Sequence, residues 1–256
     1  MHRYFVHLAY KGTSFHGWQI QPNAPSVQEE LNKVFSVLLK NPIETTGCGR
    51  TDTGVHASSF VAHFDCINEV EDPGKLVFQA NALLPLSIRV YQILKMPDEA
   101  HSRFDAIRRS YSYYISRYPN PFNTDFTWFN NRPVDLALMN EAASRCKQHQ
   151  DFTCFSKSGG QQQTNNCTIY QCEWKTNEKI LQFDVSANRF LRNMVRAMVG
   201  TMIDVGTGKM SLDTFTEILN KGSRSDAGQS VPPQGLFLEE VVYPYFHPER
   251  NYFFKL

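Results

Sequence analysis

The stretch IETTGCGRTDTGVHASSFVAHFD, residues 43–65, joins two strand-like runs through a short loop that is rich in glycine. The pattern predicts a strand, a tight loop bounded by glycines, and a second strand. Glycine lets the backbone pass close to a ligand, so polar residues between glycines are presented to that ligand. Here Arg50 and Asp52 are the charged residues that the loop would present, and the glycines around them are Gly47, Gly49 and Gly54.

Helical and strand patterns alternate along the rest of the chain, with hairpin signals and few clean strand-helix-strand crossovers. This order favours an α+β protein with a central, mainly antiparallel sheet flanked by helices. A loosely repeated β-α-β order predicts two similar sub-domains, 1–104 and 105–256, with a basic active-site cleft between them. Strands are expected at 3–10, 87–96, 108–117, 167–176, 179–187 and 235–243, and helices at 26–40, 73–84, 134–149, from about 189, and at 211–220.

Composition narrows the class of protein. The 26 Lys and Arg residues nearly balance the 25 Asp and Glu residues, so a site for an anionic partner must be a local cluster. The six cysteines lack metal-site spacing, and in a chain of 256 residues they are expected to be the reduced thiols of a cytoplasmic protein. No apolar run approaches about 18 residues, so no membrane contact is expected.

Asp52-Thr53-Gly54 matches the Asp-Thr-Gly signature of aspartic proteases. That chemistry needs two carboxylates that share one proton, and a single chain supplies them from two such turns. This sequence has one, and the nearest second candidate, SDAGQ at 225–229, lacks the hydroxyl. Arg50 would also keep the carboxylate ionised, so the protease is disfavoured. A purely turn-shaping role for Asp52 stays open, although the three glycines favour a ligand-facing one.

The stretch RFLRNMVRAMVGTMIDVG, residues 189–206, predicts a helix with one broad apolar face. At helical spacing, Arg189, Arg192 and Arg196 would form a stripe roughly 60° wide beside that face. Such a stripe can be an ordinary solvated surface. Because no acidic residue is spaced to pair with it, the stripe suits phosphates, and its innermost arginine suits a carboxylate.

The stretch RRSYSYY, residues 108–114, predicts a strand that places Arg109, Tyr111 and Tyr113 on one side. The tyrosines could be core aromatics with their hydroxyl groups near the surface. Alternatively, they could form a platform on which an unpaired base stacks, beside arginines that hold its backbone. Among the scattered histidines, His56 is a weaker candidate for a substrate contact, and no metal site is expected.

Three motifs in this order, GRTDTGVHA, RSYSY and FLRNMVRAMVG, resemble the tRNA pseudouridine synthase A (TruA) family. The resemblance extends to YKGTSFHGWQIQP, SVQEEL and PPQGLFLEEV, so it covers nearly the whole chain. It implies a homodimer that needs no cofactor or metal. It also implies isomerisation of uridine to pseudouridine in the anticodon stem-loop of tRNA, at uridines 38 to 40.

The resemblance also assigns roles to single residues. It makes Asp52 the catalytic residue, and Arg50 the residue that enters the RNA stack when the target is extruded. It makes Tyr111 the ring that stacks on the target uracil, Arg196 the salt-bridge partner of the aspartate, and Leu236 an apolar wall of the pocket. Weaker contacts to the RNA backbone are expected from Arg109, Arg189 and Arg192.

The sequence departs mildly from the family pattern. Thr53 replaces a commoner Ala, and SVPPQGL at 230–236 stands where Ala-Pro-Ala-His-Gly-Leu is frequent. These departures affect local hydrogen bonds and fine RNA contacts rather than the reaction.

The implied reaction agrees with what the residues suggest. Moving uracil from an N-glycosidic to a C-glycosidic bond needs one ionised carboxylate, not an acid/base pair as in a glycosidase. An arginine partner would favour that ionised state. The competing interpretation is a non-catalytic RNA-binding or chaperone protein on the same scaffold. Such a protein has no reason to keep an aspartate between glycines.

Overall fold

A computed structural model describes residues 1–157, 164–246 and 248 of the chain. Its contacts divide it into two compact units. The first comprises Met1–Ile107 together with the described residues from Leu238 onward, and the second comprises Arg108–Phe237. Among the described residues there are five α-helices and nine strands, and each unit contains both kinds of element. The predicted α+β class is confirmed.

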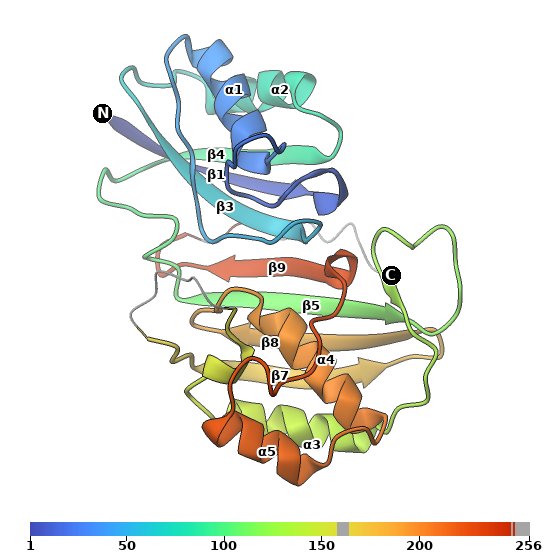
Figure 1. The fold of residues 1–256 in the computed structure, drawn as a ribbon. Coiled ribbons are helices and arrows are strands. Elements are labelled where there is room, and N and C mark those ends of the chain that lie inside the picture. Colours follow the sequence, from blue (N-terminus) through green and yellow to red (C-terminus); the bar gives the residue numbers. More distant parts are fainter. Residues whose placement is uncertain (158–163, 247, 249–256) are drawn as a thin grey trace. The chain divides into compact units, whose positions relative to one another are not determined.

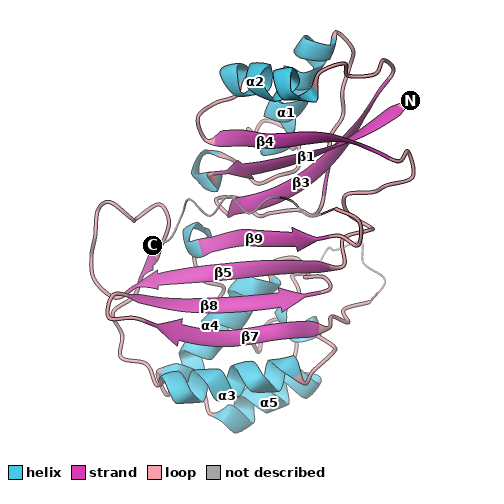
Figure 2. Ribbon diagram, turned by 180° about the vertical axis from the view of Figure 1, so that it is seen from behind, coloured by secondary structure: helices cyan, strands magenta, loops and turns pink. Residues whose placement is uncertain are grey.

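The sheet of the first unit has the strand order β4-β1-β3-β9 (Figures 1 and 2). Its central strand β1 pairs antiparallel with both β3 and β4. The short strand β2 pairs antiparallel with β3, with Thr46 opposite His63, so the strand, loop and strand expected in residues 43–65 are present. The bounds are β1 His2–Tyr10, β2 Thr46–Gly47, β3 His56–Cys66, β4 Ile88–Met96 and β9 Leu236–Val242.

Two helices belong to this unit, α1 (Val27–Leu39) and α2 (Pro73–Leu83), close to the predicted ranges. The α1 helix begins where the Ser26 side chain accepts a hydrogen bond from the Glu29 N–H, at 3.2 Å. It ends at Lys40, whose left-handed backbone (φ 54°) cannot continue a helix. The buried face of α1 includes Phe35, which stacks on Phe64 of β3 at 5.1 Å.

The second unit has the strand order β5-β8-β7, with antiparallel pairs throughout and the short strand β6 parallel to β5. Helix α4 lies over one face of these strands, in front of them in Figure 1 and behind them in Figure 2. The strands are β5 Arg108–Ser116, β6 Trp128–Phe129, β7 Ile169–Thr176 and β8 Ile180–Ala187, and the helices are α3 Leu136–Lys147, α4 Met194–Gly206 and α5 Leu212–Lys221.

The helix predicted from about Arg189 begins later than expected. Its first residue is Met194, because Asn193 adopts a left-handed conformation (φ 65°) that interrupts the helical path. The Arg192 carbonyl accepts a hydrogen bond from the Lys157 N–H at 3.1 Å, outside any helix. The predicted stripe of three arginines at helical spacing is therefore wrong, since α4 carries only Arg196 of the three.

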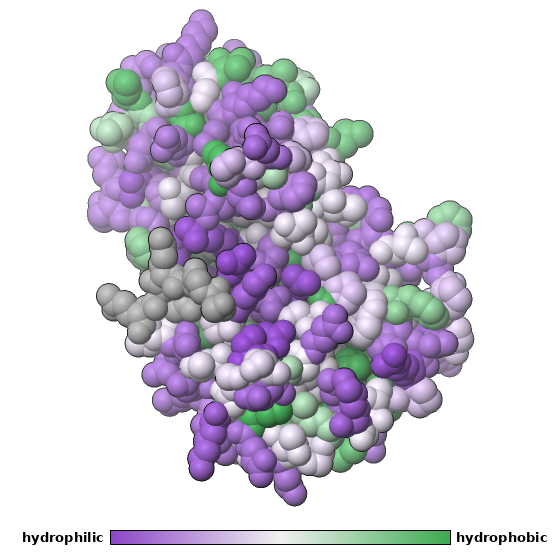
Figure 3. Space-filling model, viewed as in Figure 1, coloured by the Kyte–Doolittle hydropathy of each residue, from purple (hydrophilic) through white to green (hydrophobic). Residues whose placement is uncertain are grey.

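The six cysteines are all buried thiols without disulfide partners. Within residues 1–157 and 164–246, no helix combines the length and the apolar character needed to cross a bilayer. Hydrophilic and hydrophobic residues are interspersed on the face drawn in Figure 3. Single exposed apolar side chains are ordinary on a protein surface and need no special explanation.

Candidate active site

The loop that carries Asp52 is clamped by a segment far away in the sequence. The Trp18 N–H donates to the Thr51 carbonyl at 3.3 Å, and the Gly54 N–H donates to the Phe15 carbonyl at 3.2 Å. Between these two bonds, Gly17 has φ 91°, and a Cβ atom there would lie 2.3 Å from the Thr51 oxygen. Only glycine permits both this backbone conformation and this close approach.

Asp52 lies at the start of a turn. The Val55 N–H donates to the Asp52 carbonyl at 3.1 Å, and Gly54 supplies the positive φ (77°) that closes the turn. The Asp52 residue is half-buried, whereas Arg50 and Thr53 are exposed. The structure therefore brings Asp52 and Arg50 together on one short loop, with the aspartate partly shielded and the arginine open to solvent.

Polar contacts beneath the loop hold the loop to β1 and to the segment that follows β1. The Tyr10 hydroxyl lies 2.9 Å from the Thr51 hydroxyl, and His56 Nδ1 accepts the Gly12 N–H at 3.0 Å. Since His56 is only 1% exposed, its ring supports the loop instead of facing a substrate. The expected substrate contact at His56 therefore has no geometric support. The sequence analysis missed these supporting residues, and the signal was the aromatic and glycine-rich opening YKGTSFHGWQIQP at 10–22.

An aromatic stack lies behind the start of the loop. The Trp18 ring packs on the Phe60 ring with centroids 4.2 Å apart and planes inclined by 26°. A Cβ atom on Gly47 would lie 2.6 Å from the indole, so the backbone of β2 passes directly against Trp18. The indole is thus packed by Phe60 and Gly47, and it is 3% exposed. It is a rigid support for the loop and offers no open face on which a base could stack.

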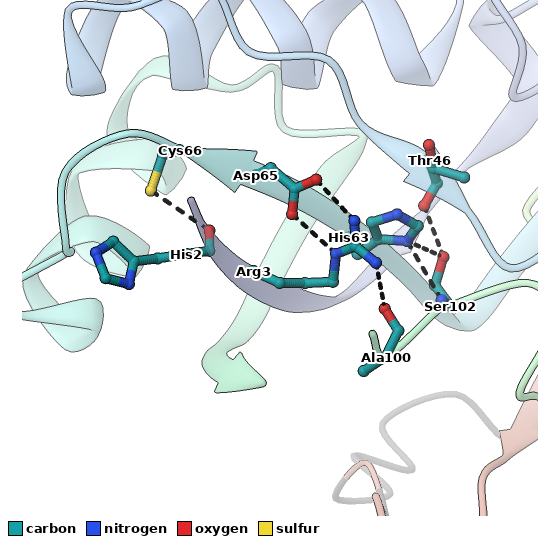
Figure 4. A network of polar contacts seen from close by, with 8 residues as sticks. All are labelled: His2, Arg3, Thr46, His63, Asp65, Cys66, Ala100 and Ser102. Atoms are coloured by element: carbon teal, nitrogen blue, oxygen red, sulfur yellow. Dashed lines mark hydrogen bonds and ion pairs between the residues drawn. The ribbon is translucent and has the colours of Figure 1, made fainter. Parts of the chain in front are cut away.

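A buried serine ties β2 to the segment that precedes β5 (Figure 4). Ser102 is fully buried, and its hydroxyl donates to the Thr46 carbonyl at 2.8 Å. His63 Nδ1 accepts a hydrogen bond from the Ser102 N–H at 3.2 Å and lies 2.8 Å from the serine hydroxyl. The Tyr243 hydroxyl donates to the Ser102 carbonyl at 2.5 Å. Ser102 is thereby fixed through both its side chain and its backbone.

An ion pair lies next to this serine. Arg3 donates from Nε and Nη2 to the two oxygens of Asp65 at 2.8 and 2.7 Å, and from Nη1 to the Ala100 carbonyl at 2.8 Å. The hydrogen bond from Arg3 holds the pKa of Asp65 below its ordinary value. Burial, aided by the positive charge of Arg3, lowers the pKa of His63 to about 4. This region therefore favours a neutral imidazole and an ionised carboxylate.

The pH dependence of stability follows from the His63 pKa. The folded pKa of about 4 lies below the ordinary 6.5, so the stabilisation is present above pH 6.5 and is lost as the pH falls toward 4. We expect His63 to account for a loss of about 2 kcal/mol in unfolding free energy between pH 7 and pH 5. Denaturant unfolding at both pH values checks this. His63→Gln should unfold more easily at pH 7 but lose about 2 kcal/mol less than the wild type on acidification, and an equal loss would contradict the assignment.

The two tyrosines of the predicted stacking platform, Tyr111 and Tyr113, have different roles in the second unit. Tyr113 is fully buried, and its hydroxyl donates to the Pro232 carbonyl at 2.8 Å, so it is a core aromatic. Burial raises its pKa well above the ordinary value. Tyr111, on the same side of β5, is half-buried and meets the Phe190 ring edge-on at 5.0 Å. Of the two tyrosines, only Tyr111 is placed to offer ring surface to a ligand.

The remaining predicted residues lie in two groups in the second unit. Arg109 of β5 donates from Nη1 to the Asn188 carbonyl at 2.9 Å. The Arg109 side chain therefore lies close to the backbone that leads into Arg189, which is half-buried. Arg196 of α4 donates from Nε to the Val231 carbonyl at 2.8 Å, and the Val231 N–H donates back to the Arg196 carbonyl at 3.2 Å. The segment held in this way leads to buried Leu236 at the start of β9, whereas Arg192 is exposed before α4.

Metal ligands do not gather at this site. Across the part of the chain that the structure describes, no group of three or more His, Cys, Asp or Glu residues could hold a metal ion. The side chains at the loop are instead one carboxylate, one guanidinium and two hydroxyls. They suit an anionic substrate and a reaction that one carboxylate can carry.

The chain is similar to proteins of one family. A family model described as tRNA pseudouridine synthase matches residues 148–244. A protein from Bacteroides fragilis, named tRNA pseudouridine synthase A, is 47% identical, over 94% of this chain and 96% of its own length. Proteins of the same name from Porphyromonas gingivalis and Azobacteroides pseudotrichonymphae are 45% and 42% identical. The alignments cover 95% and 100% of this chain, and 98% and 100% of those relatives.

Proposed function

This chain belongs to the tRNA pseudouridine synthase A family, and on that premise we propose that it isomerises uridine to pseudouridine in the anticodon stem-loop of tRNA. The observation that carries the proposal is the clamped loop of residues 47–55. There, one half-buried carboxylate, Asp52, is held on a rigid turn beside the exposed Arg50. A rigid turn keeps the reacting group in place, which is a main source of catalytic rate.

The chemistry needs one carboxylate. The bond between uracil nitrogen-1 and ribose carbon-1′ breaks, the uracil turns, and carbon-5 bonds to carbon-1′. The proton on carbon-5 passes to solvent, and nitrogen-1 takes up a proton from solvent. Asp52 could act by attack at carbon-1′, by attack on the uracil ring, or by proton removal from carbon-2′. All three routes use one ionised aspartate in the same place. The number of atoms is unchanged, so the reaction requires no co-reactant.

The other family residues act on the extruded nucleotide in this proposal. A stacked base must be flipped out of the RNA before an enzyme can act on it, at a cost of a few kcal/mol. Tyr111 stacks on the target uracil, Leu236 closes the apolar wall and Arg50 fills the gap in the RNA stack. Arg196 pairs with the aspartate, and weaker backbone contacts come from Arg109, Arg189 and Arg192. The half-buried ring of Tyr111 and the buried side chain of Leu236 support these assignments.

We also propose a homodimer that works in the cytoplasm. A net charge of +1 gives little general attraction for RNA, so binding depends on a concentrated basic surface, which a dimer would double. The six buried cysteines form no disulfide, which suits a reducing compartment. A sedimentation measurement that shows only monomers at assay concentration would contradict the dimer.

The position of the modified uridine tests the anticodon assignment. Unmodified tRNA transcripts should be incubated with the purified chain, treated with a carbodiimide that marks pseudouridine, and read by primer extension. We expect stops at uridines 38 to 40. Stops confined to another arm of the tRNA would keep the reaction and overturn the anticodon assignment, with the Asp52→Asn variant giving the background.

Two arginines of the second unit should have different effects. Arg196→Met removes the hydrogen bond to the Val231 carbonyl and the proposed partner of Asp52, so turnover should fall by about 10²-fold with little change in affinity. Arg189→Ala should mainly weaken binding and make the salt slope less negative by about 0.7 to 0.9. Single-turnover rates and binding at several salt concentrations separate the two effects. Equal losses in both variants would indicate one undivided phosphate contact.

A further inference from the structure

A pocket opens on the first unit beside the clamped loop. It has a volume of about 130 Å³, and the residues that line it include Trp18, Gln19, Arg50 and Arg103. This volume is well below the roughly 300 Å³ or more of a site for a drug-sized ligand. The pocket can therefore hold one compact chemical group.

The charges around the pocket favour an anion. Arg50 and Arg103 are both exposed at its rim, and none of the residues described as lining it is acidic. Two acids lie two residues from these arginines along the chain: Asp52 beside Arg50, and Asp105 beside Arg103. Asp105 accepts hydrogen bonds from the His101 N–H and the Tyr245 hydroxyl. Guanidinium groups bind phosphate oxygens with paired, charge-assisted hydrogen bonds. A phosphate is thus a better match for this rim than a neutral group.

The aromatic residue of the pocket argues against a stacked base. The Trp18 ring is packed by the Phe60 ring and by the backbone of Gly47, and it is only 3% exposed. A base that stacks on an aromatic platform needs an open ring face. The Gln28 amide, also in the lining, is engaged by the Ile20 N–H and the Thr45 carbonyl. The pocket therefore fits a backbone phosphate better than a base.

Arg103 is held in place from behind. Ser102, its neighbour, is fixed by the Thr46 carbonyl, by His63 and by the Tyr243 hydroxyl. The Arg103 guanidinium carbon lies 5.7 Å from the centre of the Phe104 ring. This cation-π contact supports the Arg103 side chain. A guanidinium that is already positioned loses less conformational entropy when it binds a ligand.

We propose that this pocket is a phosphate-binding site for the tRNA backbone, with Arg103 as its specific ligand beside Arg50. It would hold a phosphodiester of a nucleotide other than the target uridine and so fix the register in which the RNA meets the Asp52 loop. This inference rests on the proposed function for the identity of the RNA. The phosphate site itself is a property of Arg103 and the residues around it.

Binding measured as a function of salt tests the site. The titrations use full-length protein with Asp52→Asn in all variants, so that no turnover occurs, and a labelled anticodon stem-loop. Arg103→Met should raise Kd roughly fivefold at 0.15 M salt and reduce the magnitude of the salt slope by about 0.7 to 0.9, the value for one lost phosphate contact. Arg103→Lys should restore most of the slope. Arg89→Met, an exposed arginine of β4 outside the pocket, is the matched control and should change neither quantity.

A neutral phosphate analogue identifies the partner group. Methylphosphonate replaces one phosphodiester linkage of the stem-loop at a time. At one linkage the replacement should weaken binding by the wild type but leave binding by Arg103→Met unchanged. An unchanged slope in Arg103→Met, or an equal loss at every linkage in both proteins, would overturn the phosphate site. Tritium release by the protein with Asp52 intact is measured separately. Failure of the reaction would therefore reject the proposed function without affecting the binding result.

Discussion

Asp52→Asn is expected to lower pseudouridine formation by at least about 10³-fold, which corresponds to a loss of roughly 4 kcal/mol in transition-state stabilisation. The substitution keeps the shape of the side chain and removes the negative charge that the reaction needs. The Asp52 carbonyl accepts the Val55 N–H, a backbone bond that Asn keeps, so the turn should persist. Single-turnover assays with saturating enzyme measure the chemical step directly.

Binding and a neighbouring variant provide the controls. Affinity of Asp52→Asn for tRNA should stay within about tenfold of the wild type, or about 1.4 kcal/mol. Thr53→Ala introduces the residue that the family pattern commonly has at an exposed position of the same turn, and its rate should stay within about threefold. Retained turnover in Asp52→Asn would contradict the catalytic assignment. A large loss in Thr53→Ala would mean that the loop is sensitive to any change.

Gly17→Ala should be strongly damaging although residue 17 lies outside the loop itself. The added Cβ would lie 2.3 Å from the Thr51 carbonyl oxygen, and the left-handed backbone (φ 91°) is strained for alanine by about 1 to 2 kcal/mol. We expect a total loss of about 2 to 4 kcal/mol in unfolding free energy. Displacement of the loop by about 1 Å should also reduce the rate about 10²-fold. Denaturant unfolding and single-turnover rates measure the two effects.

Gly208→Ala separates backbone strain from the clash. Gly208 also has a positive φ (73°), but no atom lies within 4 Å of where its Cβ would be. It should lose only about 1 kcal/mol in stability and keep its activity. If Gly17→Ala and Gly208→Ala behave alike, the contact between residue 17 and the loop has no role in catalysis.

Most elements of the fold could be predicted because their signals are local. The amphipathic spacing of α1 and the capping Ser26 are both contained within about one helix length of sequence. The alternating pattern of β5 likewise predicted which tyrosines share a side of the strand. The start of α4 could not be predicted, since the apolar period continues through 189–193 without a glycine or proline. The left-handed Asn193 and the bond from Lys157 to Arg192 depend on tertiary context.

The sequence predicts the reactive residues of the site but not the residues that hold its loop in place. Asp52 and Arg50 stand out because glycines surround them, and that pattern is visible in the sequence alone. The clamp formed by Gly17 and Trp18 reaches the loop from more than 30 positions away, and Ser102 reaches Thr46 from 56 positions away. Local patterns carry no information about such pairs. His56 shows the converse, since its place beside the loop suggested a substrate contact and the structure gives it a buried supporting role.

Tritium release is the most direct test of the central claim, that this chain isomerises uridine in tRNA through Asp52. An unmodified tRNA transcript is prepared with uridine tritiated at carbon-5, the atom that loses its hydrogen when it bonds to ribose. Purified wild-type protein should release tritium until the targeted uridines are consumed, and Asp52→Asn should release none above background. Binding of the transcript without any release by the wild type would contradict the account and favour a protein that binds RNA without modifying it.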